Sequence, residues 1–379
     1  MQSNNIIRIC AAGSGKTWGI CNEALTVASN TANNKRVLIT TYTNKGVEAI
    51  YSELVKQNMG VPSKKVMVRS WYQFLLWELI KPYQTMIVGI NEIRSLDFSD
   101  RFGKPNYGRA GTKRRYFSGF DVKKDYASEL AVYINEQSKG AVIRRLEEIY
   151  SHLYIDEMQD MAGYDLEIIK LLFKSSITTI CVGDNKQATY STHNTRTNKR
   201  LTGKNLWHFC NQVEQQRMAV IEKCLISRRF NQNICSFANT VFPDFNNIST
   251  SMTEVTGHDG AFLISKNDVE VYCDFFSPAV LRFDKRTKTD GYSLNFGQCK
   301  GMTFNRVLIF PNGPLTDFLQ GKPLQSPEKY YVAVTRPRYS LAIVVDKMPN
   351  NPLFEDVEID LGEKTISTSS NKGLLGILS

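Results

Sequence analysis

The sequence predicts an α/β fold with two lobes, each a mostly parallel sheet flanked by helices. Three observations support this prediction. Short apolar runs recur along the chain, and each is followed by a polar cluster, which is typical of buried parallel strands that carry a site at their carboxyl ends. A glycine-rich stretch joins the first run to a helical pattern, as in a phosphate-binding loop. The 379 residues are also enough for two domains of ordinary size.

The composition is that of a globular protein with a basic excess. Hydrophobic residues make up 42% and charged residues 22%, so packed cores rather than disorder are expected. The net charge of +10 favours a polyanionic partner. The eight cysteines are scattered without a C-x-x-C pair, which predicts buried free thiols in a reducing compartment. Because the sequence shows neither a signal peptide nor a membrane-spanning apolar stretch, we expect a cytoplasmic protein without membrane contact.

The predicted strands can be placed in order along the chain. The first covers residues 6–10, and the later apolar runs are 37–39, 153–155, 179–182 and 307–310. The segment 100–124 is rich in glycine, aromatic and basic residues, which indicates an insertion. We expect a first lobe over 1–215 with an inserted basic and aromatic subdomain at about 75–150. A second lobe over 216–350 and a loosely held Ser/Asn/Gly-rich tail over 351–379 follow.

The stretch after the first predicted strand has the pattern of a phosphate cradle. Backbone N–H groups and the helix N-terminus favour an anion, and a lysine neutralises the β- and γ-phosphates. The threonine hydroxyl that follows can ligate Mg²⁺. Cys10 replaces the first glycine of the general pattern, so a plain glycine-rich turn is the alternative. The predicted nucleotide-binding residues are Ala12, Gly13, Ser14, Gly15, Lys16 and Thr17.

A second motif supplies carboxylates. Asp156 and Glu157 follow the apolar run 153–155 directly. One carboxylate can hold Mg²⁺ together with Thr17, and the other can orient and deprotonate the attacking water. An Asp-Glu pair in a turn is often only solvated surface, but the phosphate loop earlier in the chain favours catalysis. The two motifs predict a bound nucleotide with Mg²⁺, with Asp156 as the metal ligand and Glu157 as the base.

Taken together, these motifs and the later ones resemble the UvrD/Rep-like branch of the superfamily 1 helicases, from Ile6 to about Val345. The resemblance is carried by six further segments: 41–45, 70–72, 183–187 followed by Tyr190, 228–230, 300–304 and 331–336. It implies two RecA-like lobes that close on ATP and couple its hydrolysis to stepping along single-stranded DNA, in the 3′-to-5′ direction.

The same resemblance implies the roles of the later residues. Gln187 would sense the γ-phosphate, and Arg229 and Arg336, both in the second lobe, would contact the phosphates. Gly301 and Thr303 belong to the fifth motif of the family and would contact the nucleotide. An arginine that pairs with a local carboxylate, or lies at the surface, is the plain alternative for both arginines.

Nucleic-acid contacts are expected where positive charge and stacking faces adjoin. The candidates are Thr43, Asn44, Trp71, Tyr72 and Tyr190. Two basic loops could add support, one with Arg101, Lys104, Arg109, Lys113, Arg114 and Arg115, the other with Arg196, Lys199, Arg200 and Lys204. A solvated face is the alternative for each loop, and a place in the core is the alternative for Trp71 and Tyr72.

Three departures from the family pattern leave a second function open. Thr192 stands where these helicases usually carry a stacking aromatic, and Thr303 stands where they carry Glu, a form closer to the RecD-type branch. The segment of about 240–294 has no room for the large subdomain of typical members. Compact proteins of this kind resemble the helicase partners of OLD-family nucleases in bacterial anti-phage systems. The alternative is therefore a nucleic-acid-stimulated ATPase that regulates a nuclease partner. A P-loop kinase would need neither Gln187 nor the late arginines.

Overall fold

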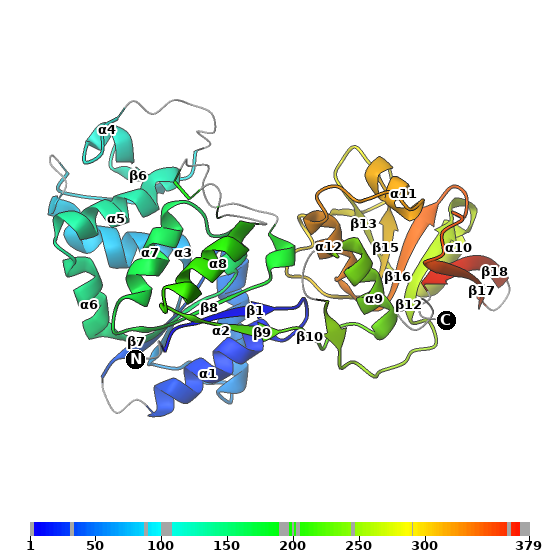
Figure 1. Ribbon diagram of the computed structural model, residues 1–379, viewed down its shortest axis with the longest axis horizontal. Coiled ribbons are helices and arrows are strands. Elements are labelled where there is room, and N and C mark those ends of the chain that lie inside the picture. The colour runs from blue at the N-terminus through cyan, green and yellow to red at the C-terminus, as the bar shows by residue number, and fades with distance from the viewer. Residues whose placement is uncertain are drawn as a thin grey trace. The chain divides into compact units, whose positions relative to one another are not determined.

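The structure is a computed structural model that describes residues 4–30, 34–86, 90–99, 108–188, 197–198, 201, 205–243, 247–289, 291–361 and 365–371. The chain divides into two compact units (Figure 1). The first consists of Met1–Ile9 and Lys16–Lys223, and the second of Cys10–Gly15 and Cys224–Ser379. The division falls eight residues after the predicted boundary, because strand β9 (Val220–Cys224) still pairs in the first sheet.

The first unit is built on a six-stranded sheet of order β3-β2-β7-β8-β1-β9. The pairs β1–β8, β8–β7, β7–β2 and β2–β3 are all parallel. Its strands besides β9 are β1 (Ile6–Cys10), β2 (Arg36–Thr41), β3 (Val66–Ser70), β7 (Tyr150–Ile155) and β8 (Thr178–Gly183). The runs predicted at 37–39, 153–155 and 179–182 are all among these strands, and their side chains are almost wholly buried, as two covered faces require.

Helices cover both faces of this sheet (Figure 1). On one side lie α1 (Lys16–Asn30) and α2 (Asn44–Gln57), which pack on each other. On the other side lie α7 (Tyr164–Phe173) and α8 (Leu206–Gln215). Because every strand pair joined by these helices is parallel, the loops after β1, β2, β7 and β8 all emerge at one edge. The predicted phosphate, acidic and glutamine motifs follow these strands.

The segment between β3 and β7 forms a small insertion with its own three-stranded sheet, β4-β6-β5. Its strands are β4 (Leu96–Asp97), β5 (Phe117–Ser118) and β6 (Asp121–Lys123). Its helical segments are α3 (Trp71–Phe74), η1 (Leu75–Ile80), η2 (Lys81–Met86), α4 (Lys113–Tyr116), η3 (Lys124–Tyr126), α5 (Ala127–Gln137) and α6 (Ala141–Ile149). Tyr116, Val122 and Leu130 are buried in the core of the first unit, so the insertion is packed onto that unit rather than tethered to it.

The second unit contains a seven-stranded sheet of order β14-β13-β15-β16-β12-β18-β17. The strands β12 (Gly260–Ser265), β13 (Ala279–Arg282), β14 (Leu294–Asn295), β15 (Phe304–Phe310) and β16 (Pro337–Val345) are parallel to their neighbours among these five. Its helices are α9 (Gln232–Val241), α10 (Val269–Phe276), α11 (Gly313–Leu319) and α12 (Glu328–Val334). A short parallel pair, β10 (Ile226–Ser227) with β11 (Ser249–Thr250), precedes the sheet. The predicted α/β fold with two mostly parallel sheets is confirmed.

The expectation of a loosely held tail is wrong for its described residues, because they form a β-hairpin. Strands β17 (Phe354–Asp360) and β18 (Thr365–Asn371) pair antiparallel, and β18 also pairs antiparallel with β12. Alternate side chains of β18, including Ile366 and Thr368, are buried. The pattern escaped the sequence analysis because small polar residues occupy buried positions that are usually apolar. Residues 372–379 lie outside the described part of the chain.

Two further observations concern thiols and helices. All eight cysteines are free, and six of them are buried, as the prediction of buried free thiols requires. Among the described residues, no helix combines the length and the apolar character needed to cross a membrane.

The second unit buries a histidine between aromatic rings. The imidazole of His258 stacks on Phe262 and Phe276 with ring centroids 4.2 and 4.0 Å apart, and its Nε2 lies 2.8 Å from the Tyr272 hydroxyl. Burial, together with the positive charge of Arg306, lowers the pKa of His258 to about 3. The ring is therefore neutral throughout the physiological pH range.

This histidine is expected to make the second unit sensitive to acid. In the unfolded chain the imidazole binds a proton below its usual pKa of about 6.5, whereas the folded state resists protonation down to about pH 3. Folding stability is thus lost as pH falls through this window, by about 2 kcal/mol between pH 6.5 and 5. Urea unfolding at pH 7 and pH 5 should show a smaller pH effect for His258→Gln than for the wild type. Equal losses in both proteins would refute this assignment.

Candidate nucleotide site and nucleic-acid interface

The backbone conformation of the phosphate loop shows which of its positions need glycine. Gly13 and Gly15 have positive φ angles of 74° and 86°, a region that disfavours side chains. Cys10 ends strand β1 and Ala12 is fully buried, and neither has a positive φ. Ala11 donates its backbone N–H to Cys224 O at 2.8 Å and so continues the strand. The replacement of the usual first glycine by Cys10 therefore costs no backbone strain.

Within the second unit, the loop is held against the segment that carries Arg229. The Arg228 N–H donates to Gly13 O at 2.9 Å. A Cβ atom placed on Gly13 would overlap the Cβ of Arg229 and lie 2.8 Å from Ser227 Oγ. The backbone of the loop and the predicted arginine finger are thus in direct contact, a feature that motif order alone did not reveal.

The residues of the phosphate loop and of the helix after it suit a magnesium-bound nucleotide. Ser14 Oγ is buried without a hydrogen-bond partner among the described residues, so a phosphate oxygen could satisfy it. A Cβ on Gly15 would meet no atom within 4 Å, which leaves open space for a phosphate close to the backbone. Lys16 and Thr17 form the first turn of α1, where the helix dipole also favours an anion.

The acidic motif lies at the carboxyl end of β7. Asp156 is only 5% exposed, and its N–H donates to Thr40 O at 2.8 Å, which extends the pairing of β7 with β2. Glu157 is half-buried with a left-handed φ of 57° and begins a short 3-10 turn, η4 (Met158–Asp160). The turn directs the chain back over the sheet edge. Mg²⁺ commonly uses one or two protein oxygens besides phosphates, which the Thr17 hydroxyl and the Asp156 carboxylate could supply.

The segment 183–187, which contains Gln187, lies beside the acidic motif because β8 runs between β1 and β7. Asp184 caps the turn η5 (Asn185–Gln187), and its carboxylate accepts a hydrogen bond from the Gln187 side-chain amide at 2.7 Å. Burial raises the pKa of Asp184, while the charge of Lys16 and the bond from Gln187 act in the opposite direction. Lys16 and Gln187 are therefore both close to one buried carboxyl group.

A link between these motifs was not predicted. Gln159 is almost fully buried, and its Oε1 accepts a hydrogen bond from the Asp184 N–H at 2.9 Å. Its Nε2 donates to the Glu157 carboxylate. Gln159 thus joins the predicted base to the motif that holds Gln187. The sequence showed Gln159 within the acidic motif, but its role depends on β7 and β8 being neighbours.

In the second unit, the predicted arginines are bound by backbone carbonyls. Arg229 donates from Nη1 to Thr335 O at 2.9 Å. Arg336 is 2% exposed and donates to Val332 O at 2.7 Å and to Met302 O at 3.1 Å. The guanidinium of Arg336 therefore ties the fifth motif to helix α12.

The other predicted nucleotide contacts of this unit, Gly301 and Thr303, flank Met302, whose carbonyl accepts a hydrogen bond from Arg336. Gly301, with a positive φ of 84°, and Thr303 are both exposed just before β15. Their exposure leaves them accessible to a ligand.

The predicted nucleic-acid residues divide into exposed and buried groups. Thr43 and Asn44 are exposed at the start of α2, where the Thr43 hydroxyl caps the helix by accepting from Gly46 N. Trp71 is fully buried, and its indole N–H donates to Asp165 Oδ1 at 2.7 Å. The alternative of a core aromatic therefore holds for Trp71, whose ring faces are not accessible to a base.

Tyr72 is also largely buried, but it adjoins an exposed ring. Its ring packs on that of Tyr42, with the centroids 5.8 Å apart, and meets the edge of Phe98 at 5.4 Å. Phe98 is 59% exposed and is the accessible ring of this cluster. The sequence gives no local signal for Phe98, because this residue stands alone between polar residues.

The predicted basic loops are partly outside the described residues, as are Tyr190, Thr192 and Arg101. The same holds for Lys104, Arg196, Lys199, Arg200 and Lys204. In the described part of the first loop, Arg115 forms a two-pronged ion pair with Glu129, at 2.5 and 2.8 Å, and so serves the insertion rather than a ligand.

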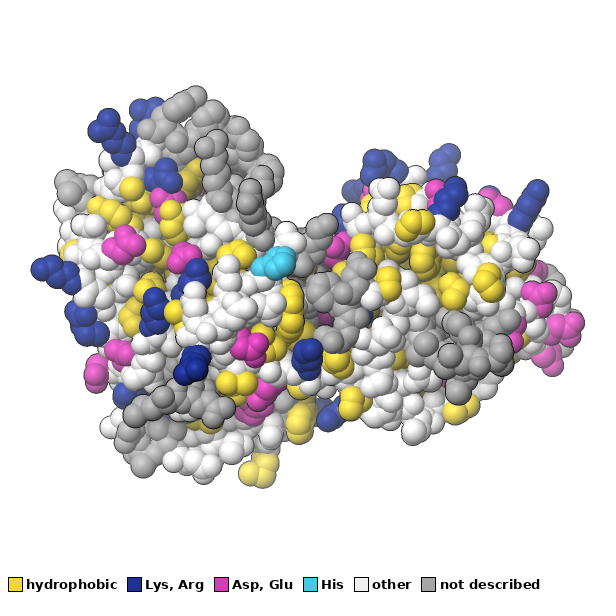
Figure 2. Space-filling model, in the orientation of Figure 1, with side chains coloured by type: hydrophobic (Ala, Val, Ile, Leu, Met, Phe, Trp, Pro, Cys, Tyr) yellow, Lys and Arg dark blue, Asp and Glu magenta, His cyan; other side chains and the backbone are white. Residues whose placement is uncertain are grey.

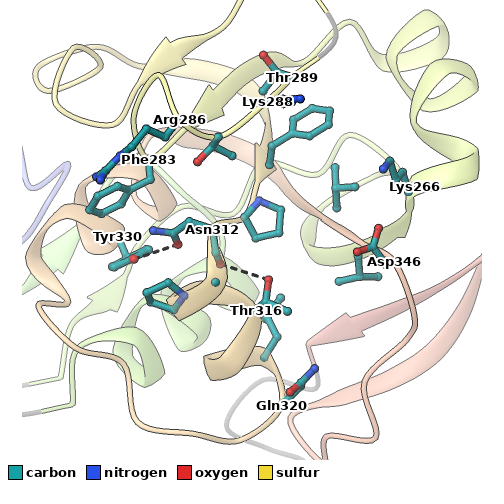
Figure 3. A pocket seen from close by; sticks show the side chains of 18 of the residues that line it. Lys266, Phe283, Arg286, Lys288, Thr289, Asn312, Thr316, Gln320, Tyr330 and Asp346 are labelled. Atoms are coloured by element: carbon teal, nitrogen blue, oxygen red, sulfur yellow. Dashed lines mark hydrogen bonds between the residues drawn. The ribbon is translucent and has the colours of Figure 1, made fainter.

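The second unit contains a large cavity at the carboxyl ends of β12, β13, β15 and β16 (Figure 3). Its volume is about 1130 Å³. Rings of Phe283, Phe310 and Tyr330 line it together with Lys266 and Lys288. Cationic and aromatic groups share this cavity with the carboxylates of Asp284 and Asp346, and Asp284 forms an ion pair with Arg286. In the sequence, the polar residues that follow the predicted strand 307–310 indicate a functional site at this edge of the sheet.

Two family models match parts of the chain. Residues 78–202 match the UvrD/REP helicase N-terminal domain. Residues 141–345, more than half of the chain, match the viral superfamily 1 RNA helicase core domain. The chain belongs to the superfamily 1 helicases. The predicted resemblance to this superfamily and to its UvrD/Rep-like branch is confirmed.

One similar solved structure is "Complex structure of Arterivirus nonstructural protein 10 (helicase) with DNA". It shares 14% sequence identity with this helicase at a TM-score of 0.47, and the match covers 90% of this chain and 60% of the viral one. The chain thus spans less than two thirds of that relative. A comparison with curated proteins finds no match.

Proposed function

We propose that this helicase couples ATP hydrolysis to movement on single-stranded DNA, in the 3′-to-5′ direction. The observation that carries the proposal is the position of β8 between β1 and β7. This order brings Lys16, the acidic pair and Gln187 to one edge of the first sheet, as phosphoryl transfer requires. The direction rests on the resemblance to the UvrD/Rep-like branch.

In this proposal, the phosphate loop Ala12–Thr17 holds the phosphates of ATP, and Thr17 and Asp156 hold Mg²⁺. The metal would neutralise charge that develops on the phosphates. Glu157 takes a proton from the attacking water, and Gln187 senses the γ-phosphate. The second unit supplies Arg229 and Arg336 for the phosphates and Gly301 and Thr303 for the rest of the nucleotide.

Single-stranded or tailed DNA is the proposed partner. Thr43 and Asn44 are exposed and available to its backbone. The cavity of the second unit offers Lys266 and Lys288 to phosphates. The proposal gives no stacking role to Trp71, since its ring is buried.

The test is ATP hydrolysis by Lys16→Ala in the presence of single-stranded DNA. Loss of the charge that neutralises the phosphates should lower the stimulated rate by about 10²-fold or more. Lys64→Ala removes an exposed lysine that lies before β3, at the opposite edge of the sheet, and should keep the wild-type rate. If Lys16→Ala hydrolyses ATP as fast as the wild type, the proposal fails. RNA and duplex DNA, measured in parallel, establish the preferred polymer.

The compact second unit favours one alternative, a nucleic-acid-stimulated ATPase that regulates a nuclease partner. Between α9 and β15, the described residues form strands of the two sheets of this unit and helix α10, without a separate subdomain. A motor of this kind could hydrolyse ATP without separating strands. ATPase activity without unwinding of a tailed duplex would favour this alternative, whereas strand separation would favour the helicase.

A further inference from the structure

The inserted subdomain of the first unit presents a cationic surface around one exposed ring. The hairpin β5–β6 turns at Gly119 and Phe120, and the Phe120 ring is 42% exposed at its tip. The guanidinium of Arg94 lies 4.7 Å from the ring centroid, and the ammonium of Lys113 lies 5.3 Å from it. Arg114 follows Lys113 on α4 and is also exposed. We refer to Arg94, Lys113, Arg114 and Phe120 as the hairpin surface.

The backbone beneath these cations is firmly held. The Arg115–Glu129 ion pair fastens α4 to α5, and the hydroxyl of buried Tyr116 donates to the same carboxylate. Lys123 Nζ donates to Arg114 O at 2.6 Å, which joins α4 to β6. The Arg94 N–H donates to Phe120 O at 3.1 Å. The exposed cations therefore project from an ordered backbone. Because this backbone is already fixed, binding a ligand costs little backbone entropy.

Two acidic residues of the insertion, Asp97 and Asp121, bind groups of its own scaffold. Asp121 accepts hydrogen bonds from the backbone and hydroxyl of Ser95, at 3.0 and 2.8 Å, and Asp97 accepts one from Ser99 N at 2.9 Å. Figure 2 shows basic side chains projecting from the surface over α4. The surface therefore presents positive charge to an anionic partner.

We propose that the hairpin surface binds the phosphate backbone of a nucleic-acid duplex, such as the double-stranded part of a tailed substrate. The inference rests on the proposed action on nucleic acid and deepens it. Arg94 and Lys113 both lie close to the Phe120 ring. The ring therefore holds these two cations in place and does not offer a free face on which a base could stack. A single strand is bound through stacked bases as well as phosphates. A duplex keeps its bases enclosed and presents phosphates outward, which matches a surface of ordered cations.

The test measures Kd by fluorescence anisotropy for a blunt duplex and for a single strand of equal length, over a series of salt concentrations. Lys113→Ala/Arg114→Ala should weaken duplex binding several-fold and reduce the slope of log K against log salt by about 2, one for each lost phosphate contact. Binding of the single strand should stay at the wild-type level. Lys56→Ala/Lys64→Ala removes two exposed lysines elsewhere on the first unit and should leave both affinities unchanged.

A second variant tests the role assigned to the ring. Phe120→Leu keeps an apolar side chain but removes the ring that positions the two cations, so it should weaken duplex binding less than the double variant does. Unchanged duplex binding in the double variant, or an equal loss for duplex and single strand, would overturn the proposal. ATP hydrolysis stimulated by single-stranded DNA is measured on the same proteins. If the wild type lacks that activity, the proposed function fails, and the duplex affinities still decide the inference separately.

Discussion

Replacement of Glu157 by Gln should lower ATP turnover by about 10²–10⁴-fold while nucleotide binding stays close to that of the wild type. The amide has the same shape as the carboxylate but cannot take a proton from the attacking water. Gln159 contacts the carboxylate of Glu157 and the backbone of Asp184, and its amide can also bond to a glutamine at 157. The loop should therefore keep its geometry. Single-turnover hydrolysis and titration with a fluorescent ATP analogue separate the two effects.

The control for this variant is Glu148→Gln, which makes the same chemical change at an exposed position on α6. It should hydrolyse ATP at the wild-type rate. A Glu157→Gln protein with normal turnover would exclude Glu157 as the base. Parallel loss of turnover and of nucleotide affinity would instead mean that Glu157 supports the loop rather than the proton transfer.

The main elements of the first unit could be predicted because their signals are local. A continuous apolar run followed by a polar cluster marks a parallel strand and its functional end, as at 153–155 and 179–182. The left-handed positions of the phosphate loop coincide with Gly13 and Gly15, where the sequence itself requires glycine. The loop, the acidic pair and Gln187 can therefore be predicted as site residues without knowledge of the strand order.

The contacts that were missed depend on residues far apart in the chain. The family pattern makes Trp71 a candidate nucleic-acid contact. In the structure, its indole N–H donates to Asp165, 94 residues later in the chain, and Ser128 donates to the same carboxylate. Nothing local distinguishes such a buried tryptophan from an exposed one. The pairing of Arg115 with Glu129 likewise appears only when α4 packs against α5. A basic run in the sequence does not tell which of its members faces solvent.

The contact between Gly13 and Arg229 leads to the second large effect, that of Gly13→Ala. The new methyl group would lie at a left-handed φ, which costs about 1–2 kcal/mol. It would also overlap Arg229 Cβ and crowd Ser227, and such overpacking costs about 1–3 kcal/mol more. We therefore expect a loss of about 2–5 kcal/mol in the free energy of unfolding of the nucleotide-free protein.

Gly15→Ala separates the two contributions, because its φ is also left-handed but its methyl group would meet no atom within 4 Å. In chemical denaturation without nucleotide, it should lose only the backbone term of about 1–2 kcal/mol. Gly13→Ala should in addition displace Arg229 from the loop and reduce turnover by about 10²-fold, since a shift of about 1 Å in a positioned group can have that effect. Equal destabilisation by the two variants would mean that the loop and the Arg229 segment are not in contact in solution. A larger loss for Gly13→Ala, together with its loss of turnover, would tie the phosphate loop physically to the residue proposed to complete the nucleotide site.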